Sequence, residues 1–181
     1  MKRPALALLG VLMVPAGVHA QSDQIESALA TAPARGRDNI AVIQWSADYT
    51  YTTLKEGSGP MVCFHRGPER GRPAFSVQCT SAANLDRVAQ NRKFRAESED
   101  RPGENALIAA AEDNGNRVAP EYGSVWINTN GDDQASARTH TTIAMPGATT
   151  ASTGFPDNGR GGGAFIMGAG TTGAHLMTPG H

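Results

Sequence analysis

Two segments near the end of the sequence share one arrangement: a histidine, a short apolar stretch that contains methionine, and then Pro-Gly. They are HTTIAMPG, which begins at His140, and HLMTPG, which begins at His175. Imidazole nitrogen suits zinc and copper, and thioether sulfur favours Cu(I). On neighbouring strands the two histidines could share one face of a sheet and bind one zinc or copper ion. Further candidate ligands are Met145, Met177, His65 and His181.

The alternative is that each histidine is a hydrogen-bonded structural residue. No H-x-H or H-E-x-x-H spacing fixes two ligands locally. Alternation along a strand expected at residues 138–145 places His140 with Arg138 and Thr142 on its more polar face. The sequence therefore leaves open both a metal site at His140 and His175 and a structural role for each.

The hexapeptide GAGTTG has the letters of a dinucleotide-binding fingerprint, with Gly168, Gly170 and Gly173 in the spacing G-x-G-x-x-G. Such a site needs a helix that follows the turn and an acidic residue about 20 positions later. Only AHLMTPGH follows Gly173, and it contains Pro179. The glycines instead predict the tight turn of a C-terminal hairpin that joins AFIMG to AHLMT. We expect no nucleotide cofactor.

Other catalytic patterns are weak. The chain contains no G-x-S-x-G nucleophile elbow. Residues 128–133, NTNGDD, have the composition of a calcium loop but lack its ligand spacing and closing Glu, so they predict a turn. No catalytic residue is assigned, and a non-enzymatic role is favoured.

The first 20 residues, MKRPALALLGVLMVPAGVHA, have the layout of a secretory signal peptide. Lys2 and Arg3 form a positive start, and an apolar run too short to cross a bilayer follows. Small residues at Val18 and Ala20 predict cleavage before Gln21 and export to the periplasm or the medium. Residues 21–181 then form one globular domain with no membrane span.

Charge excludes some partners. Without Lys2 and Arg3 the chain keeps 14 basic residues against 17 acidic ones, a formal charge of −3. This balance gives no overall attraction to nucleic acid or anionic lipid. Glu69, Pro68 and glycines interrupt the basic cluster at residues 66–72, which predicts a solvated loop, with anion binding as the alternative. The expected partner is an unidentified small molecule or protein.

Cys63 and Cys79 are the two cysteines of the chain. Export favours a disulfide between them, and closure of this loop is worth about 3 kcal/mol in the chain-entropy model. The rival is a metal site that uses both thiols, but the pair lacks the close C-x-x-C spacing of structural zinc sites. The sequence therefore predicts the disulfide.

Hydrophobic periodicity and turn residues define the elements that must position these groups. Helices are predicted at residues 22–32, 81–98 and 104–113, the last ended by Gly115. Strands are predicted at residues 39–45, 49–54, 61–64, 75–79, 123–128, 138–145 and around Phe165. The pair Asn130-Gly131 predicts a hairpin turn between two of these strands. Residues 147–163 form a long loop rich in glycine and threonine, the expected contact surface.

Several motifs occur in one order along the chain: QW at 44–45, LKEGSGPMVC at 54–63, QC at 78–79, HTTIAMPGATTASTGFP at 140–156 and AGTTGAHLMTP at 169–179. This order resembles a family of uncharacterised bacterial secreted or periplasmic proteins with a Cys…Cys pair and a C-terminal AGT-x-x-AH-x-M-x-P tail. The chain departs from the family at Val62, where a Trp is frequent, and at Thr172, where Pro is usual. The resemblance implies export and this layout, and carries no catalytic residue.

These observations predict an α+β fold: an antiparallel sheet of short strands with two or three helices and one disulfide. The expected role is a non-enzymatic binding module of the envelope or the extracellular medium. The alternative is a metal-binding protein or metal-dependent enzyme that uses His140 and His175.

Overall fold

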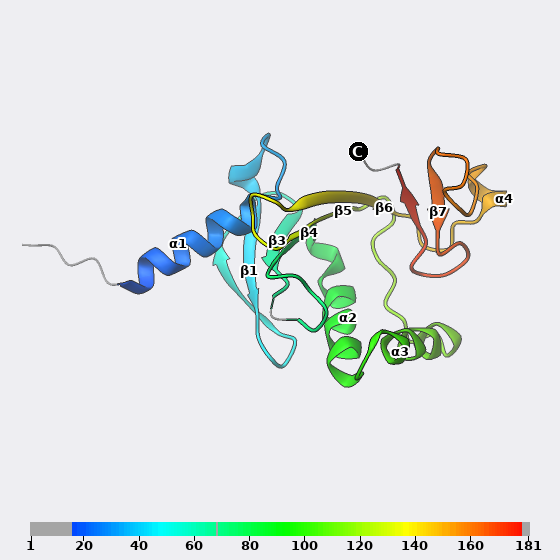
Figure 1. The fold of residues 1–181 in the computed structure, drawn as a ribbon, viewed down its shortest axis with the longest axis horizontal. Helices are drawn as coiled ribbons and strands as arrows, with labels where there is room; N and C mark the ends of the chain where they lie inside the picture. The colour runs from blue at the N-terminus through cyan, green and yellow to red at the C-terminus, as the bar shows by residue number, and fades with distance from the viewer. Residues whose placement is uncertain (1–15, 68, 179–181) are drawn as a thin grey trace, which may run out of the picture.

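The computed structural model describes residues 16–67 and 69–178, and the fold there is α+β, as predicted. Eight strands form one sheet in the order β2-β1-β3-β4-β5-β6-β8-β7 (Figure 1). Neighbouring strands are antiparallel, except that β1 and β3 are parallel. The strands are β1 (Ala41–Trp45), β2 (Tyr51–Lys55), β3 (Met61–His65), β4 (Phe75–Ser81), β5 (Val125–Gly131), β6 (Arg138–Ala144), β7 (Phe165–Met167) and β8 (His175–Met177).

Four α-helices accompany the sheet in the described part of the chain: α1 (Ala16–Leu29), α2 (Leu85–Glu97), α3 (Arg101–Asp113) and α4 (Thr150–Thr153). Helices α2 and α3 follow one another beneath the middle of the sheet in the view of Figure 1. The first helix begins earlier and ends earlier than predicted, and it runs through the expected cleavage point before Gln21. Residues 1–15 of the predicted signal peptide lie outside the described residues.

One face of the sheet packs on α1. Val42, Cys63, Val77 and Cys79 are at most 1% exposed there and belong to one apolar cluster with Ala28 and Leu29 at the buried end of α1. Cys63 and Cys79 lie directly opposite each other on β3 and β4, with their Cα atoms 4.1 Å apart, and form the predicted disulfide. The disulfide lies at the centre of the apolar core and joins β3 to β4. The loop between these strands is rich in glycine and proline and would constrain them far less.

The opposite face packs on α2. Val62 and Phe64, which alternate with Cys63 along β3, contact Leu85 and Val88 of the helix. Trp45 extends this second cluster, and its ring meets that of Phe64 edge-on at 5.7 Å. Because successive strand residues point to opposite faces, α1 and α2 cover opposite sides of the sheet.

The hairpin between β5 and β6 pairs the strands that the sequence predicted, but its turn lies further along the chain. Asn130 is still in the ladder, opposite Arg138, so the prediction of a turn at Asn130-Gly131 is wrong. A Cβ at Gly131 would stand 2.5 Å from the Cα of Ala137, so the glycine permits a close approach of two strands. Asp133 closes the actual turn by accepting bonds of 2.8 Å from the backbone and the hydroxyl of Ser136.

Helix α3 also begins before its predicted start. Its first turn contains Pro102, and the Asp100 side chain caps it by accepting a 2.8 Å bond from the Gly103 amide. Proline is tolerated in a first helical turn, where its missing N–H would have no helical partner, so Arg101-Pro102-Gly103 starts this helix instead of breaking the chain. Gly115 ends the helix in the left-handed conformation, as predicted.

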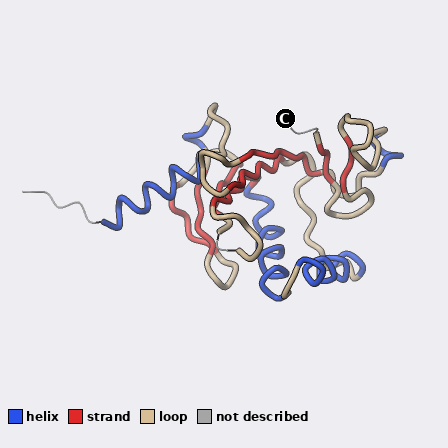
Figure 2. Tube along the Cα trace, in the orientation of Figure 1, coloured by secondary structure: helices blue, strands red, loops and turns tan. Residues whose placement is uncertain are grey.

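The C-terminal part consists of long loops and one small hairpin (Figure 2). Strands β7 and β8 pair antiparallel, with Met167 opposite His175, so the predicted hairpin is confirmed. Gly168 and Gly170 have positive φ in its turn, and strand β8 follows them, where a dinucleotide-binding fingerprint requires a helix. The predicted loop at residues 147–163 holds the single turn α4, with a capping box between Thr149 and Ser152.

Candidate functional site

The sheet face that packs on α2 becomes polar toward β5 and β6. Gln78 and Asn128 lie opposite each other on β4 and β5, and the Gln78 Nε2 donates to Asn128 Oδ1 over 2.6 Å. One pair further along, Ser76 donates to Asn130 Oδ1 over 2.7 Å. Gln78 lies opposite Phe64 on β3, so this row of amides is on the same sheet face as the apolar residues that contact α2.

Arginines face this amide row from the loop before β4 and from α2. Arg66 is 9% exposed, and its Nη1 donates to Asn128 Oδ1 over 2.9 Å. Arg87 and Arg95, each 7% exposed, lie eight residues apart on one side of α2, with Asn91 between them. Glu104 of α3 is also buried and accepts a 2.9 Å bond from Arg95 Nη2.

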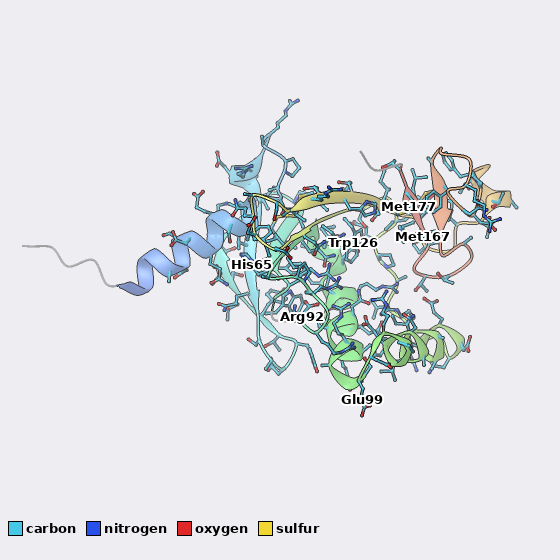
Figure 3. All side chains as sticks on the ribbon, in the orientation of Figure 1. His65, Arg92, Glu99, Trp126, Met167 and Met177 are labelled. Carbon is cyan, nitrogen blue, oxygen red and sulfur yellow. A yellow bond between two sulfur atoms is a disulfide. The ribbon has the colours of Figure 1, made fainter. Side chains whose placement is uncertain are left out.

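Together these groups enclose a groove of about 560 Å³ between the sheet and helices α2 and α3, here called the polar groove. Trp126, Met167 and Met177, labelled in Figure 3, belong to its sheet side. Its charged and polar lining residues are Arg66, Arg72, Gln78, Arg87, Asn91, Arg95, Arg101, Glu104, Asn128, Asn130, His140, Thr142 and His175.

Two buried carboxylates organise the arginines. Glu69, with a side chain 7% exposed, accepts short bonds from Arg92 and Arg95 and lies 3.6 Å from Arg72 Nε. Glu104 is 3.7 Å from the guanidinium of Arg101 and bonds Arg95 as well. Arg95 therefore joins the two carboxylates into one ion network that connects the loop before β4 with α2 and α3.

Burial makes the charged form of these arginines costly. The pKa of Arg66 falls to about 10, first because of desolvation, with the charges of Arg95 and Arg92 adding to the fall and Glu69 opposing it. The pKa of Arg87 also falls to about 10, again chiefly through burial. Both guanidinium groups stay protonated at neutral pH, and any added negative charge in the polar groove would stabilise them.

The C-terminal hairpin is attached to the helices through Thr172. Its hydroxyl accepts a 2.7 Å bond from Arg87 Nη1 and makes a short bond to Glu112. Its backbone N–H donates to Glu112 Oε2 over 3.1 Å. Proline has neither the hydroxyl nor the N–H, so a proline at this position could make none of these contacts.

The structure places His140 and His175 on the same face of the sheet, both lining the polar groove, but not side by side. His140 Nε2 lies 3.3 Å from Met177 Sδ, whereas His175 Nδ1 lies 2.8 Å from the Gly173 carbonyl oxygen. His175 pairs with Ala144, four residues beyond His140 on β6. At about 3.3 Å per residue this offset is roughly 13 Å along the strands, too long for one ion to bridge without a large shift.

The other candidate ligands lie elsewhere. Met145 packs in an apolar cluster with Ile166 and Leu176. His65 lies on the α1 side of the sheet, with Nε2 2.7 Å from the Ser27 hydroxyl. His181 is outside the described residues. Within residues 16–67 and 69–178, no three His, Cys, Asp or Glu side chains gather as a metal site would require. The metal site at His140 and His175 stays a prediction.

Two arginine-rich segments are more deeply buried than their composition indicates. The loop at residues 66–72 is not a simple solvated loop, because Arg66 and the Glu69 side chain are buried. Helix α2 is not a plain surface helix either, since its Arg87 and Arg95 are buried. The only local signal in the sequence is the spacing of Arg87, Asn91 and Arg95, which puts three polar groups on one helical side.

Comparisons with models of protein families, with curated proteins and with solved structures find no match to this chain. Functional inference therefore rests on the polar groove and its chemistry.

Proposed function

We propose that this protein is an exported, non-enzymatic binding module that takes a small molecule in the polar groove. The observation that carries this proposal is a groove of about 560 Å³ whose amide and guanidinium groups are already held in place by one another. Guanidinium and amide groups bind and orient a ligand, and they are poor proton acceptors or nucleophiles at neutral pH. Side chains fixed before binding lose little entropy when a ligand arrives.

Export is supported by the signal-peptide pattern of residues 1–20 and by the disulfide between Cys63 and Cys79, a bond typical of oxidising compartments. Among the described residues, no helix is both long enough and apolar enough to cross a membrane. Expression of the full chain in a Gram-negative host, followed by mass measurement of the secreted or periplasmic product, tests the expected cleavage before Gln21. Recovery of uncleaved chain from the cytoplasm would contradict export.

The groove itself is tested with a matched pair of substitutions on β6. Thr142 lines the polar groove, whereas the adjacent Thr141 is exposed on the opposite face. Thr142→Trp should fill the groove, and Thr141→Trp should leave it open. Thermal-shift screening of the folded proteins against neutral sugars, amino acids, carboxylates, phosphates and metal ions should yield a ligand that stabilises the parent and Thr141→Trp but not Thr142→Trp. Equal responses of both variants would place binding elsewhere.

A second candidate function is binding of a soft metal ion, favoured by the 3.3 Å contact between His140 Nε2 and Met177 Sδ. Bonds of about 2.0 Å to nitrogen and about 2.3 Å to sulfur set two ligands of one ion roughly 3.5 Å apart at a tetrahedral angle. Met167 lies opposite His175 on the next strand, so it is as far along the sheet from His140 as His175 is, and we do not count it as a ligand. Cu(I) prefers this combination of imidazole and thioether.

Titration with Cu(I) and Zn(II) separates this pair from the two-histidine site. If His140 and Met177 bind the ion, His140→Ala and Met177→Leu each weaken Cu(I) binding at least tenfold, whereas His175→Ala and the half-buried control Met145→Leu do not. Loss of binding in His175→Ala as well would restore the site predicted from the sequence. Equal binding by all four variants and the parent would make the histidines structural.

A further inference from the structure

We propose that the ligand of the polar groove carries an oxyanion, a carboxylate or a phosphoryl group, which binds Arg66 and Arg72 beside the amides of Asn128 and Asn130. This inference deepens the proposed function and rests on it. All four side chains line the groove, and Arg66 is joined to Asn128 by its 2.9 Å hydrogen bond. The oxyanion site therefore lies where the loop between β3 and β4 meets β5.

Cationic groups outnumber carboxylates around this site. Six arginines lie within 4.0 Å of Glu69 or Glu104 and share these two acids between them. They are Arg66, Arg70, Arg72, Arg92, Arg95 and Arg101. Four of them, Arg66, Arg72, Arg92 and Arg95, have side chains at most 21% exposed. Like charges held together away from bulk water repel one another, and a bound anion would relieve that repulsion.

Unused hydrogen-bond donors show the same imbalance. In the described part of the chain, five buried side-chain atoms have no hydrogen-bond partner, and four of them are N–H donors. Of these, Arg72 Nε belongs to a residue that lines the polar groove and lies 3.6 Å from Glu69 Oε2, whereas Arg92 Nε and Trp45 Nε1 belong to residues that line an adjoining pocket of about 360 Å³. Buried donors are normally paired, so a surplus of donors indicates a missing acceptor.

The orientation of the two asparagines adds further donors. Asn128 Oδ1 accepts from Arg66 and Gln78, and Asn130 Oδ1 accepts from Ser76. With both oxygens occupied, the Nδ2 groups are what these amides offer a ligand. A planar guanidinium fork flanked by amide N–H groups matches the geometry of a carboxylate or phosphoryl oxygen pair.

The rest of the molecule favours a small ligand over a polyanion. The whole chain has a formal charge of −1, so no broad positive surface attracts nucleic acid. Five arginines line the polar groove, and its far end offers the apolar groups of Trp126, Met167 and Met177. A small molecule with one anionic end and a less polar body fits both ends.

The test uses the protein expressed from its full chain, titrated by calorimetry with inorganic phosphate, pyrophosphate and citrate. We expect at least one probe to bind, and binding to weaken as sodium chloride is added, because salt screens the attraction. Arg72→Gln removes one charge from a side chain that is still 21% exposed and should weaken binding at least tenfold. Arg160→Gln, an exposed change in the 147–163 loop, is the matched control and should bind as the parent does.

Several outcomes separate this inference from the proposed function. Binding of a neutral sugar that Thr142→Trp abolishes, with no binding of any anion, would overturn the oxyanion and keep the groove. Unchanged anion binding in Arg72→Gln and also in Arg66→Lys would place the anion elsewhere and overturn the inference. Near-ultraviolet circular dichroism confirms that each variant is folded. A preference for citrate over phosphate, or the reverse, assigns the source as a carboxylate or a phosphoryl group.

Discussion

The two faces of the sheet are built from alternate residues of the same strands, yet one face is apolar and the other becomes polar. On the α1 face, Val77 and Cys79 of β4 are completely buried among apolar side chains and carry the disulfide. On the other face, Ser76 and Gln78 of the same strand are also buried, at 1% and 7% exposed, but they bond to the amides of Asn130 and Asn128. Burial alone therefore does not distinguish core from site in this protein.

The difference lies in what replaces water. Apolar side chains fill the α1 face and exclude water from it. Their burial stabilises this face whether or not a ligand is bound. The α2 face beyond Phe64 replaces water with hydrogen bonds and ion pairs, each of which must be satisfied. A buried polar face stabilises the fold less than a hydrocarbon face of similar size does. We assign function to the α2 face for this reason. The predictions below test that contrast.

The largest effect is expected for Glu69→Gln in the ion network. This change keeps the shape of the side chain but removes the charge shared by Arg92, Arg95 and Arg72. Removing one partner from a buried ion network leaves uncompensated charge and costs about 3–5 kcal/mol. The free energy of unfolding in urea measures the loss.

Glu97→Gln is the control for this prediction. Glu97 pairs with Lys93 at 3.8 Å, but both side chains are about half exposed. Exposed pairs of this kind contribute about 0.3–0.5 kcal/mol on a helix. If Glu69→Gln costs no more than Glu97→Gln, the network is solvated and the contrast between the faces fails.

The disulfide provides the next effect, on the apolar face. Replacing Cys63 and Cys79 together by alanine should lower the free energy of unfolding by about 3 kcal/mol, the value for a closed loop of this size. Because the bond lies on the face opposite the polar groove, ligand binding by the folded variant should be unchanged. Calorimetric melting with and without ligand checks both parts, and weaker binding would show that the two faces are coupled.

Thr172 connects the hairpin of β7 and β8 to the helices, and its effect should be smaller. Thr172→Val keeps the volume but removes hydroxyl bonds to Arg87 and Glu112. Hydrogen bonds to charged groups contribute about 1.5–3 kcal/mol each, and the hairpin lies at the edge of the sheet. We expect a loss near the lower end of that range and faster hydrogen exchange in residues 165–177. Thr141→Val, at an exposed threonine of β6 on the opposite face of the sheet, should serve as the control.

The fold was largely predictable because its signals are local. Apolar alternation identified the strands, and export together with two cysteines predicted the Cys63–Cys79 bond. Errors occurred where a close approach of distant residues overrides local preference. Asn130-Gly131 is a strong turn signal, yet Gly131 is needed in the strand because Ala137 packs against it.

The polar groove was not predictable in the same way. Arg66, Arg95 and Asn128 come from three separate elements, and each alone is typical of a solvated surface residue. Arg95 pairs with both Glu69 and Glu104, two acids that lie 35 positions apart in the chain, and no periodicity encodes this arrangement. His140 was correctly placed on the more polar face by alternation, but alternation cannot give the register that separates it from His175.

The smallest effect is a pH dependence on the α1 side. Burial lowers the pKa of His65, and a bond to the Gln24 carbonyl only partly opposes this. Since the folded protein disfavours the charged imidazole, the contribution of His65 to stability is full above its unfolded pKa near 6.5 and is lost as the pH falls through its lower folded pKa. Stability should therefore decrease on acidification below about pH 6.5, and α1 should loosen because Ser27 bonds this ring.

His65→Gln isolates this effect, because glutamine still reaches Ser27 but does not titrate. The difference in free energy of unfolding between parent and variant should shrink, or change sign in favour of the variant, as the pH is lowered from 7.5 to 5. A difference that is constant over this range would show that protonation of His65 does not change the free energy of unfolding. It would also show that the α1 face, like the α2 face, can hold a cation, which would remove the chemical contrast on which the assignment of the polar groove depends.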